Sequence, residues 1–389
     1  MSKDKRPDTR IVDGGRRREW RGQLVNVPIS RASTILFDSV AELNAASPRR
    51  LGKGGYGLQG TATHWALSEA LTEIEPGAAG TALTSSGLAA VTAALTAVLS
   101  AGDDLLMVDS VYGPTRRYCD DILGRCGISI RYYDPVATPD QLEALLKPET
   151  KAIFLESPGS QTFEVQDVPG ICSMARKHGV TTLIDNTWAT PLFFPAISRG
   201  VDISIMALTK YIGGHSDLLM GSIAANEQWF KRVQTTVFDL GHAVSADDAF
   251  LAARGLRTLH LRLQRHQDSA LKVARWLAER PEVGTMLHPA FESCPGHEFW
   301  KRDFNGSSSL FAFSLKGQTA ADAERFVDSL EEFGIGYSFG GFESLALPVH
   351  PKRTAGAKSE RALVRLHIGL EDPQDLIEDL SQAFAPLDS

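Results

Sequence analysis

A lysine placed directly after an apolar, β-branched run is the first residue of this sequence that could do chemistry. Lys210 follows the run at 203–208 within the stretch SIMALTKYIGGHSD. A single lysine at the end of a strand is usually a surface charge. In a desolvated site, however, a lysine can lose its proton and form a Schiff base with a carbonyl compound. Partner residues elsewhere in the chain must decide between these two interpretations.

Two partners would hold an anionic, aromatic cofactor. Ser86 and Gly87 open the apolar helix in SSGLAAVTAAL. Free backbone N–H groups and the helix dipole favour a phosphate there, although an ordinary helix N-cap has the same sequence. Asp185 ends the strand in LIDNTWATP, and a carboxylate at such a position could keep a pyridine nitrogen protonated.

Two further residues would hold the cofactor ring and the substrate. Tyr112, in VDSVYGPTRR, follows another strand and could stack on a flat ring, unless it is a half-buried loop tyrosine. Arg365, in ALVRLHIGLED, could bind a carboxylate with two parallel hydrogen bonds, unless it is an exposed strand charge. Together with Lys210, these residues are the set that a pyridoxal 5′-phosphate enzyme acting on an amino acid requires.

The stretch GYGLQG at 55–60 favours a different cofactor, because it fits the G-x-G-x-x-G pattern of dinucleotide-binding loops. That fingerprint needs a strand directly before its glycines, and the preceding AASPRRLGKG is not strand-like. We therefore interpret the stretch as an adaptable loop that presents Tyr56. An NAD-dependent dehydrogenase is therefore the less favoured alternative. A non-catalytic binding or regulatory protein with the same fold is a further alternative, but such a protein would not need Lys210, Tyr112, Asp185 and Arg365 together.

These residues need a scaffold that brings strand ends together. From about residue 85, apolar-periodic segments alternate with short β-branched runs. The expected helices are 87–100, 114–125, 138–147 and 168–178, and the expected strands are 105–109, 128–133, 151–157, 181–186 and 203–208. The alternation predicts an α/β fold with a mostly parallel sheet, in which chemistry gathers at the carboxyl ends of the strands.

The C-terminal part has a different texture. The expected elements there are a helical stretch from about 245 to 280, a strand at 309–315, a helix near 320–333, the stretch YSFGGFESL at 337–345 and a strand at 362–370. We expect an N-terminal arm at 1–60, a large cofactor-binding domain at 61–255, and a smaller α/β domain at 256–389, with a long helix joining the two domains.

Composition excludes several classes of protein. The 389 residues are 43% hydrophobic and 22% charged, and the net charge of −7 gives no reason to expect nucleic-acid binding beyond a solvated basic arm in the first 22 residues. The nearly apolar segment 88–99 is too short to span a membrane. The sequence has four cysteines, Cys119, Cys126, Cys172 and Cys294, and their spacing is not that of a metal site. We therefore expect no bound metal, and we expect a cytoplasmic protein whose thiols are reduced.

Eight stretches resemble, in order, the Cys/Met-metabolism family of pyridoxal-phosphate enzymes: SSGLAA, DSVYGPTRRYCD, LESPGS, DNTWATP, TKYIGGHSD, RGLRTLHLRLQRH, HEFWKRDFNGSSSLF and YSFGGFESL. The resemblance implies fold type I, the aspartate-aminotransferase-like fold, with a mostly parallel seven-stranded sheet in the large domain and a smaller C-terminal α/β domain. It also implies a homo-oligomer, a homotetramer built from dimers with shared active sites.

Site residues follow from the resemblance position by position. It implies that Lys210 and Tyr112 are catalytic, with Lys210 bound to the cofactor, Asp185 on the ring nitrogen and Tyr112 stacked on the ring. Residues that would bind the phosphate are Ser86, Gly87, Leu88 and Thr209, with Tyr56 reaching in from the neighbouring subunit. Residues that would bind the substrate are Ser338, Phe339 and Arg365.

The resemblance further implies a carbon–sulfur lyase. LESPGS, DNTWATP and ALTK resemble the β-lyase branch of the family, which converts L-cystathionine to homocysteine, pyruvate and ammonia in methionine biosynthesis. A γ-lyase, a γ-synthase and a broad cysteine-S-conjugate β-lyase are the alternatives within the family. Two positions depart from the pattern. Leu58 stands where an arginine is usual, so that Lys53 or a nearby arginine would have to replace a phosphate contact, and Phe339 stands where the β-lyases have tryptophan.

Overall fold

In the computed structural model, which describes residues 5–46, 54–356 and 362–385, short apolar runs form a seven-stranded sheet with the order β1-β7-β6-β5-β4-β2-β3. The strands β3, β2, β4, β5 and β6 are parallel neighbours, and β7 is antiparallel to both β6 and β1. Their bounds are β1 (Gly80–Thr84), β2 (Asp104–Val108), β3 (Ser129–Tyr133), β4 (Thr150–Glu156), β5 (Thr181–Asp185), β6 (Ile203–Ala207) and β7 (Gly221–Ala225). The predicted α/β fold with a mostly parallel sheet is confirmed.

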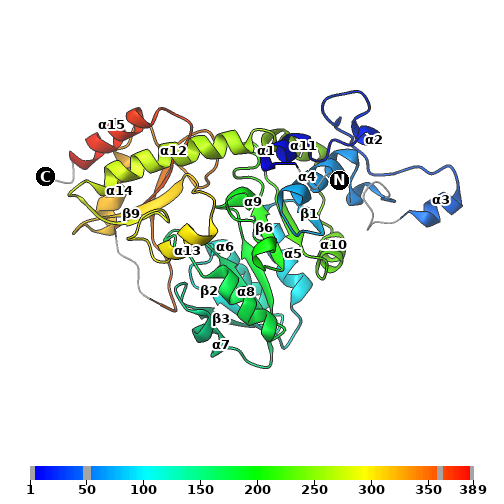
Figure 1. Ribbon diagram of the computed structural model, residues 1–389, viewed down its shortest axis with the longest axis horizontal. Coiled ribbons are helices and arrows are strands. Elements are labelled where there is room, and N and C mark those ends of the chain that lie inside the picture. Colours follow the sequence, from blue (N-terminus) through cyan, green and yellow to red (C-terminus); the bar gives the residue numbers. More distant parts are fainter. Residues whose placement is uncertain (1–4, 47–53, 357–361, 386–389) are drawn as a thin grey trace.

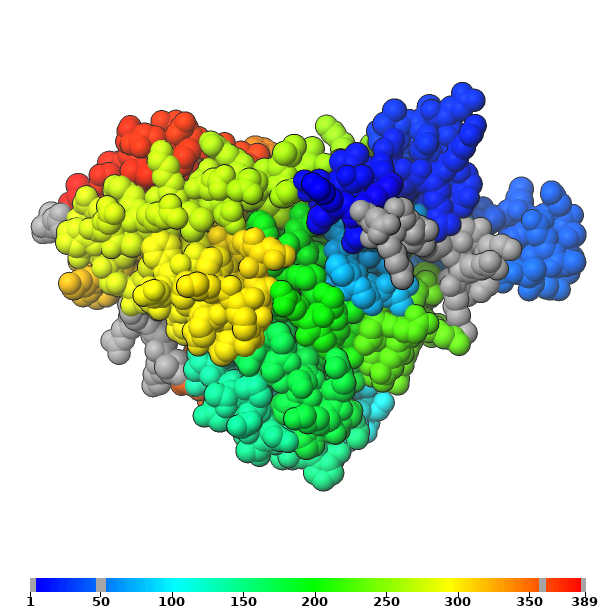
Figure 2. All heavy atoms as spheres, in the orientation of Figure 1, coloured from blue at the N-terminus to red at the C-terminus, as the bar shows by residue number. Residues whose placement is uncertain are grey.

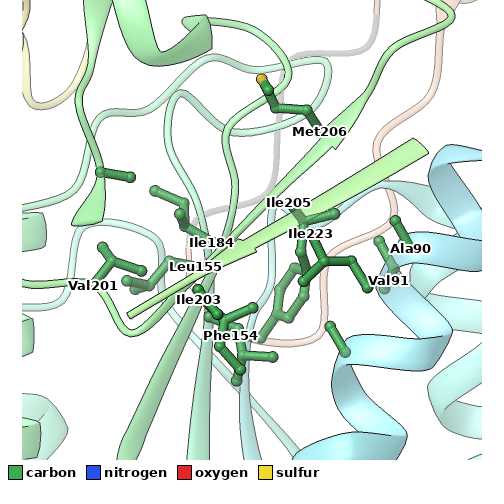
Figure 3. Close-up of a cluster of buried hydrophobic side chains, with 14 of the residues drawn as sticks. Ala90, Val91, Phe154, Leu155, Ile184, Val201, Ile203, Ile205, Met206 and Ile223 are labelled. Atoms are coloured by element: carbon green, nitrogen blue, oxygen red, sulfur yellow. The ribbon is translucent and has the colours of Figure 1, made fainter. Parts of the chain in front are cut away.

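Burial on both faces explains why the inner parallel strands β2, β4, β5 and β6 are nearly continuous apolar runs. Every residue of β2 is buried, and so is every residue of β7. Figure 3 shows part of the resulting core, in which Ile205 of β6 and Ile223 of β7 lie beside Ala90 and Val91 of the neighbouring helix. The sequence analysis missed β1 and β7 because alanine, glycine, serine and threonine make up most of them, and these residues give a weak strand signal.

Helices cover this sheet and lead into its strand ends. Their bounds are α4 (Ala62–Ile74), α5 (Gly87–Val98), α6 (Gly113–Tyr118), the π-helical turn η2 (Cys119–Leu123), α7 (Pro139–Glu143), α8 (Val168–Lys177), α9 (Thr190–Phe193), the 3₁₀ turn η3 (Ile197–Arg199), α10 (Phe230–Asp239) and α11 (Ala246–Leu256). Two of the predicted helices are longer than the helices in the structure. The helix expected at 114–125 changes to π geometry after Tyr118, and the helix expected at 138–147 ends at Glu143, with Ala144 as its C-cap.

A second, five-stranded sheet has the order β10-β11-β12-β9-β8. Its elements are β8 (Val283–Leu287), α13 (His297–Asp303), β9 (Leu310–Leu315), α14 (Ala320–Asp328), β10 (Gly334–Ile335), β11 (Leu345–Val349), β12 (Leu363–His367) and α15 (Pro373–Phe384). The helix expected near 320–333 ends at Asp328, because the carboxylate of Asp379 accepts the N–H groups of Glu331 and Glu332 instead. YSFGGFESL forms a loop that leads into β11.

The helix expected from 245 to 280 is two helices, α11 and α12 (Leu259–Ala278). The helical geometry is interrupted at Arg257 and Thr258. Just before this interruption, the Arg262 guanidinium donates to the Gly255 carbonyl at 2.7 Å. α12 then runs along the second sheet toward α15 (Figure 1). The expected domain boundary at 255/256 lies within the last turn of α11, and the division into domains stays a prediction.

The N-terminal segment lies partly apart from both sheets. It contains α1 (Pro7–Asp13), α2 (Arg18–Arg21), α3 (Val40–Ala45) and the 3₁₀ turn η1 (Gly57–Gln59). α1 packs on α4, whereas α3 projects from the body as the right-hand extremity of Figures 1 and 2. Within the residues that the structure describes, no helix combines the length and the apolar character needed to cross a membrane.

Candidate active site

The carboxyl edge of the large sheet borders a cavity of about 230 Å³. β2, β4, β5 and β6 all end at this edge, so the residues that follow them converge there. Most of the residues predicted from the sequence line this one cavity: Ser86, Gly87, Leu88, Tyr112, Asp185, Thr209, Lys210, Phe339 and Arg365. Ser338 contacts the lysine, and Tyr56 lies elsewhere.

Lys210 stands just beyond the end of β6, with its amine in a polar but largely desolvated position. Its Nζ donates to Ser338 Oγ at 2.7 Å and lies 4.9 Å from the centre of the Phe339 ring. Burial and, to a smaller extent, the charge of Arg365 lower the pKa of Lys210 to about 8, and the charge of Asp185 opposes this shift. The neutral, nucleophilic amine is therefore accessible near physiological pH.

Ser338 holds the lysine from a strained turn. Its φ of 118° lies in the left-handed region that disfavours a residue with a side chain. Gly340, at φ 81°, packs so close to the lysine segment that a Cβ there would be 2.8 Å from Tyr211 N. The Gly340 N–H donates to His367 Nε2 at 3.1 Å, and the Arg365 guanidinium donates to the Ser338 carbonyl at 3.3 Å. The loop between Tyr337 and β11 is thus fixed against Lys210 from two sides.

Asp185 presents a largely desolvated carboxylate at the end of β5. Its Oδ1 accepts the Thr187 N–H at 3.0 Å. Burial raises the pKa of Asp185, while the hydrogen bonds from Thr187 and the charge of Lys210 act against that increase. A cationic ring nitrogen beside this carboxylate would stabilise its ionised form.

The amino end of α5 forms another wall of the cavity. Ser86 is the N-cap, and its Oγ accepts the Ala89 N–H at 3.1 Å, so the ordinary capping interpretation of this serine holds. The N–H groups of Gly87 and Leu88 have no partner among the hydrogen bonds of the described residues. A Cβ on Gly87 would lie 2.5 Å from the Cβ of Ala207, so glycine permits this close approach to β6. Two free donors at a helix amino end favour an anion.

Tyr112 and Arg365 approach the cavity from opposite sheets. The Tyr112 N–H donates to Glu156 Oε2 at 2.8 Å, and the ring is 46% exposed toward the cavity mouth. Burial raises the pKa of Tyr112, and the charges of Asp185 and Glu156 raise it further. These groups keep the phenol protonated, which favours ring stacking over the role of a base. Arg365 comes from β12, and burial lowers the pKa of its guanidinium.

Tyr56 is not part of the Lys210 cavity of its own chain. It is 53% exposed and borders a separate cavity of about 400 Å³, together with Leu58. Tyr56 makes an isolated bridge with Thr34, and η1 follows it directly. Among the described residues before GYGLQG no strand enters the sheet, so the context of a dinucleotide fingerprint is absent there. Lys53 lies outside the described residues.

The comparisons with known proteins agree with this geometry. The model of the family of Cys/Met metabolism PLP-dependent enzymes matches residues 8–385. The chain belongs to this family. It is 43% identical over 392 residues to cystathionine beta-lyase MetC of Escherichia coli, covering 98% of this chain and 99% of that protein. It is 42% identical over 386 residues to cystathionine beta-lyase of Haemophilus influenzae, covering 97% of each.

A solved structure shows the same fold. The crystal structure of metB from Corynebacterium glutamicum superimposes with a TM-score of 0.90 at 29% identity, covering 99% of this chain and 99% of that one. The predicted family and its pyridoxal 5′-phosphate cofactor are confirmed.

The cavity of this Cys/Met-metabolism enzyme has donors that suit pyridoxal 5′-phosphate. The free N–H groups of α5 match the phosphate, the Asp185 carboxylate matches the ring nitrogen, and the Lys210 amine matches the aldehyde. The Thr209 hydroxyl is engaged with Met220, accepting its N–H at 3.0 Å. No group of three His, Cys, Asp or Glu side chains in the described part of the chain is arranged to bind a metal ion.

A larger groove of about 900 Å³ adjoins the cavity and shares Tyr112 and Arg365 with it. One wall is the segment 347–353, which comprises the end of β11 and the residues after it, and contacts at Arg353 and Thr354 hold this segment against the other sheet. Arg353 donates to the Asp109 carbonyl at 2.6 Å and to Glu164 Oε1 at 2.8 Å, and the Thr354 N–H donates to Asp109 Oδ2 at 2.7 Å. The groove gives the small cavity an outlet of defined shape.

Sequence reasoning missed several residues of this enzyme's site. Glu156 and Trp188 line the cavity, and Gln161, with a φ of 69°, borders both the cavity and the groove. Glu156 had a usable signal, since LESPGS places a carboxylate at the end of a strand just as LIDN does. The contact between Asp109 and Arg353 had none, because 244 positions separate the two residues.

Proposed function

We propose that this chain is a PLP-dependent cystathionine β-lyase, which converts L-cystathionine and water to homocysteine, pyruvate and ammonia. The observation that carries the proposal is the placement of a lysine with a lowered pKa in one cavity with the carboxylate of Asp185 and the guanidinium of Arg365. The two β-lyases of similar length described above support the choice of reaction within the family.

The residues that would hold the cofactor follow from the donors of the cavity. The N–H groups of Gly87 and Leu88 bind the phosphate at the amino end of α5, with Ser86 and Thr209 beside them. Asp185 pairs with the ring nitrogen, and Tyr112 stacks on the ring. When bound, the cofactor supplies an electron sink for the electron pair left at Cα.

Arg365 and Lys210 would orient and deprotonate the substrate. The guanidinium of Arg365 binds the α-carboxylate, with Ser338 beside it, and holds the Cα–H bond near the lysine. The neutral Lys210 amine then takes the Cα proton and returns a proton to the departing sulfur. Phe339 packs beside the amine and excludes water from it.

The groove beside the cavity would hold the homocysteine half of the substrate. A cavity of about 230 Å³ is smaller than the pockets that enclose ligands of ordinary size, which are about 300–1,000 Å³. The leaving half therefore extends past Tyr112 into the groove lined by Arg117 and the segment 347–353.

We further propose a homo-oligomer in which Tyr56 of one subunit reaches the cofactor phosphate of its neighbour, as in a homotetramer built from dimers. Tyr56 lies outside the Lys210 cavity of its own chain, which leaves it available to another. The projecting N-terminal segment exposes large apolar side chains that a subunit contact would bury: Leu24, Val25, Ile29, Leu36, Val40 and Leu43.

We also propose that the protein is located in the cytoplasm, because its cysteines are free thiols and the cytoplasm is a reducing compartment.

Product analysis tests the reaction directly. The purified protein with pyridoxal 5′-phosphate and L-cystathionine should release pyruvate and homocysteine in equal amounts. Release of 2-oxobutyrate and cysteine would make the chain a γ-lyase instead. Lys210→Ala should abolish both turnover and the borohydride-stable attachment of the cofactor, and a fully active variant would reject Lys210 as the attachment point.

A further inference from the structure

Glu156 places a second carboxyl group beside Asp185 at the floor of the cavity. The two residues end the adjacent parallel strands β4 and β5 and are direct partners in the register. Partners in neighbouring strands project to the same face of a sheet, and both residues line the same cavity. The reaction described above uses only one of these two acids.

The surroundings of Glu156 provide little compensation for a negative charge. The residue is 9% exposed, and it takes part in no ion pair among the described residues. Its Oε2 accepts the N–H of Tyr112 at 2.8 Å. The positive charge that acts on it is that of Arg353, whose guanidinium is already paired with Glu164.

We propose that Glu156 is a positioning residue that remains a neutral carboxylic acid in the working enzyme. The single negative charge at the floor of the cavity then resides on Asp185, where the cofactor nitrogen needs it, and the Glu156 carboxyl fixes Tyr112 above the cavity. This inference rests on the proposed pairing of Asp185 with the cofactor ring.

The electrostatics of the two acids agree with this assignment. Two adjacent carboxyl groups in a site of low dielectric cannot both ionise. Burial raises the pKa of Glu156 well above its ordinary value, and the charge of Asp185 raises it further, against the opposing effects of the Tyr112 N–H and Arg353. Asp185 has the nearby charge of Lys210 and the hydrogen bonds of Thr187 to support ionisation. The proton therefore resides on Glu156.

Infrared difference spectroscopy of the holoenzyme at neutral pH tests the protonation state without reference to turnover. The C=O stretch of a protonated carboxylic acid should be present in the wild type and absent in Glu156→Gln. Glu75→Gln identifies the band of another buried glutamate whose pKa is raised, and Glu282→Gln, which removes a carboxylate paired with Arg280, should leave the acid bands unchanged. Acid bands that are identical in the wild type and Glu156→Gln would overturn the proposal.

Cofactor binding tests the positioning role. Glu156→Leu removes the acceptor of the Tyr112 N–H and should weaken pyridoxal 5′-phosphate binding about tenfold, as expected when a buried donor loses its partner. Glu156→Gln keeps a neutral acceptor and should restore the dissociation constant and the absorption spectrum. If Gln and Leu are equally impaired, the required group is a carboxylate and the proposal fails. A protein that shows this pattern but releases no pyruvate would refute the proposed lyase reaction and leave the Glu156 assignment standing.

Discussion

Lys210 illustrates how a residue's surroundings decide its chemistry. Its burial and the charge of Arg365 both act to deprotonate the amine, and only Asp185 opposes them. The same three residues have separate proposed roles: Lys210 transfers the proton, Arg365 binds the substrate carboxylate and Asp185 pairs with the ring nitrogen. Arg365 therefore has two effects, binding the substrate carboxylate and favouring the neutral lysine.

The pH dependence of cofactor attachment should reveal this electrostatic effect. Because the neutral amine attacks, the rate at which the apo-protein binds pyridoxal 5′-phosphate covalently should rise with pH and level off above about 8. Arg365→Gln removes a positive charge, so the pKa of Lys210 should rise and the profile should move to higher pH. Stopped-flow absorbance measures the profile. Arg125→Gln, at an exposed arginine bonded to a backbone carbonyl, is the control, and an unmoved profile in Arg365→Gln would contradict the assignment.

Ser338 should show a conflict between stability and activity. Both Ser338→Gly and Ser338→Ala remove the hydrogen bond to Lys210 and should slow turnover. Only glycine also relieves the strain of the positive φ, so the Gly variant should be more stable than the Ala variant by about 1 kcal/mol. Unfolding by denaturant measures the difference. Equal stability of the two variants would show that the turn stores no strain.

At the scale of elements, the two sheets are joined near the site by the segment after β11. This segment is connected to the carboxyl end of β2 through Asp109, which also pairs with Arg116 at 2.5 Å. Asp109 and Tyr112 both lie in the loop that follows β2. The residue that holds the segment after β11 is therefore close in sequence to the tyrosine that is proposed to stack on the cofactor ring.

Removing the contacts of Arg353 with Asp109 and Glu164 should make the segment after β11 more dynamic. Arg353→Ala removes the donor to Asp109 and Glu164, and amide hydrogen exchange in 350–356 should accelerate about tenfold or more, as expected for the loss of a charge-assisted hydrogen bond. Lys352→Ala is the matched control, since its side chain is exposed and makes no ion pair or hydrogen bond within the described part of the chain. Unchanged exchange in Arg353→Ala would mean that other contacts hold the segment.

At the scale of the whole molecule, Glu75 gives the fold a pH-dependent weakness. Its buried carboxyl accepts the Ile197 N–H at 3.2 Å and the Ser204 hydroxyl at 3.1 Å, which joins the end of α4 to β6. Burial raises the pKa of Glu75 from 4.5 to about 8. Between these two values the folded state binds a proton that the unfolded state lacks, so stability falls as the pH rises.

Glu75→Gln should remove this pH dependence. Relative to the wild type, the variant should gain thermal stability as the pH rises from about 4.5 to about 8, with a limit of about 5 kcal/mol at 1.4 kcal/mol per pKa unit. Thermal unfolding of the apo-protein across this window measures the gain. A constant offset between the two proteins at all pH values would show that Glu75 does not titrate there.

A shared active site should permit complementation between inactive subunits. Tyr56→Ala and Lys210→Ala damage different halves of the proposed site, so a mixed dimer contains one intact site. Dissociating and reassociating equal amounts should restore activity up to about a quarter of the wild type, because half of the random dimers are mixed and each has one good site of two. Either variant reassociated alone is the control. Absence of recovery in confirmed mixed dimers would place Tyr56 in the site of its own chain.

Several parts of this molecule were accessible from sequence alone. The parallel strands β2, β4, β5 and β6 were found because burial on both faces makes them nearly continuous apolar runs. Lys210, Asp185 and Tyr112 were found because each directly follows such a strand. β1 and β7 were missed because small residues carry little local signal.

The sequence by itself determined the α/β class, the family and the chemical types at the strand ends, because these depend on local patterns of burial and residue type. Only the tertiary structure decided which charges act on one another. The neutral tendency of Lys210 depends on Arg365 from the other sheet, and the protonation of Glu156 depends on its register with Asp185. Electrostatic energies depend on distance and burial in three dimensions, and the order of residues along a chain specifies neither directly.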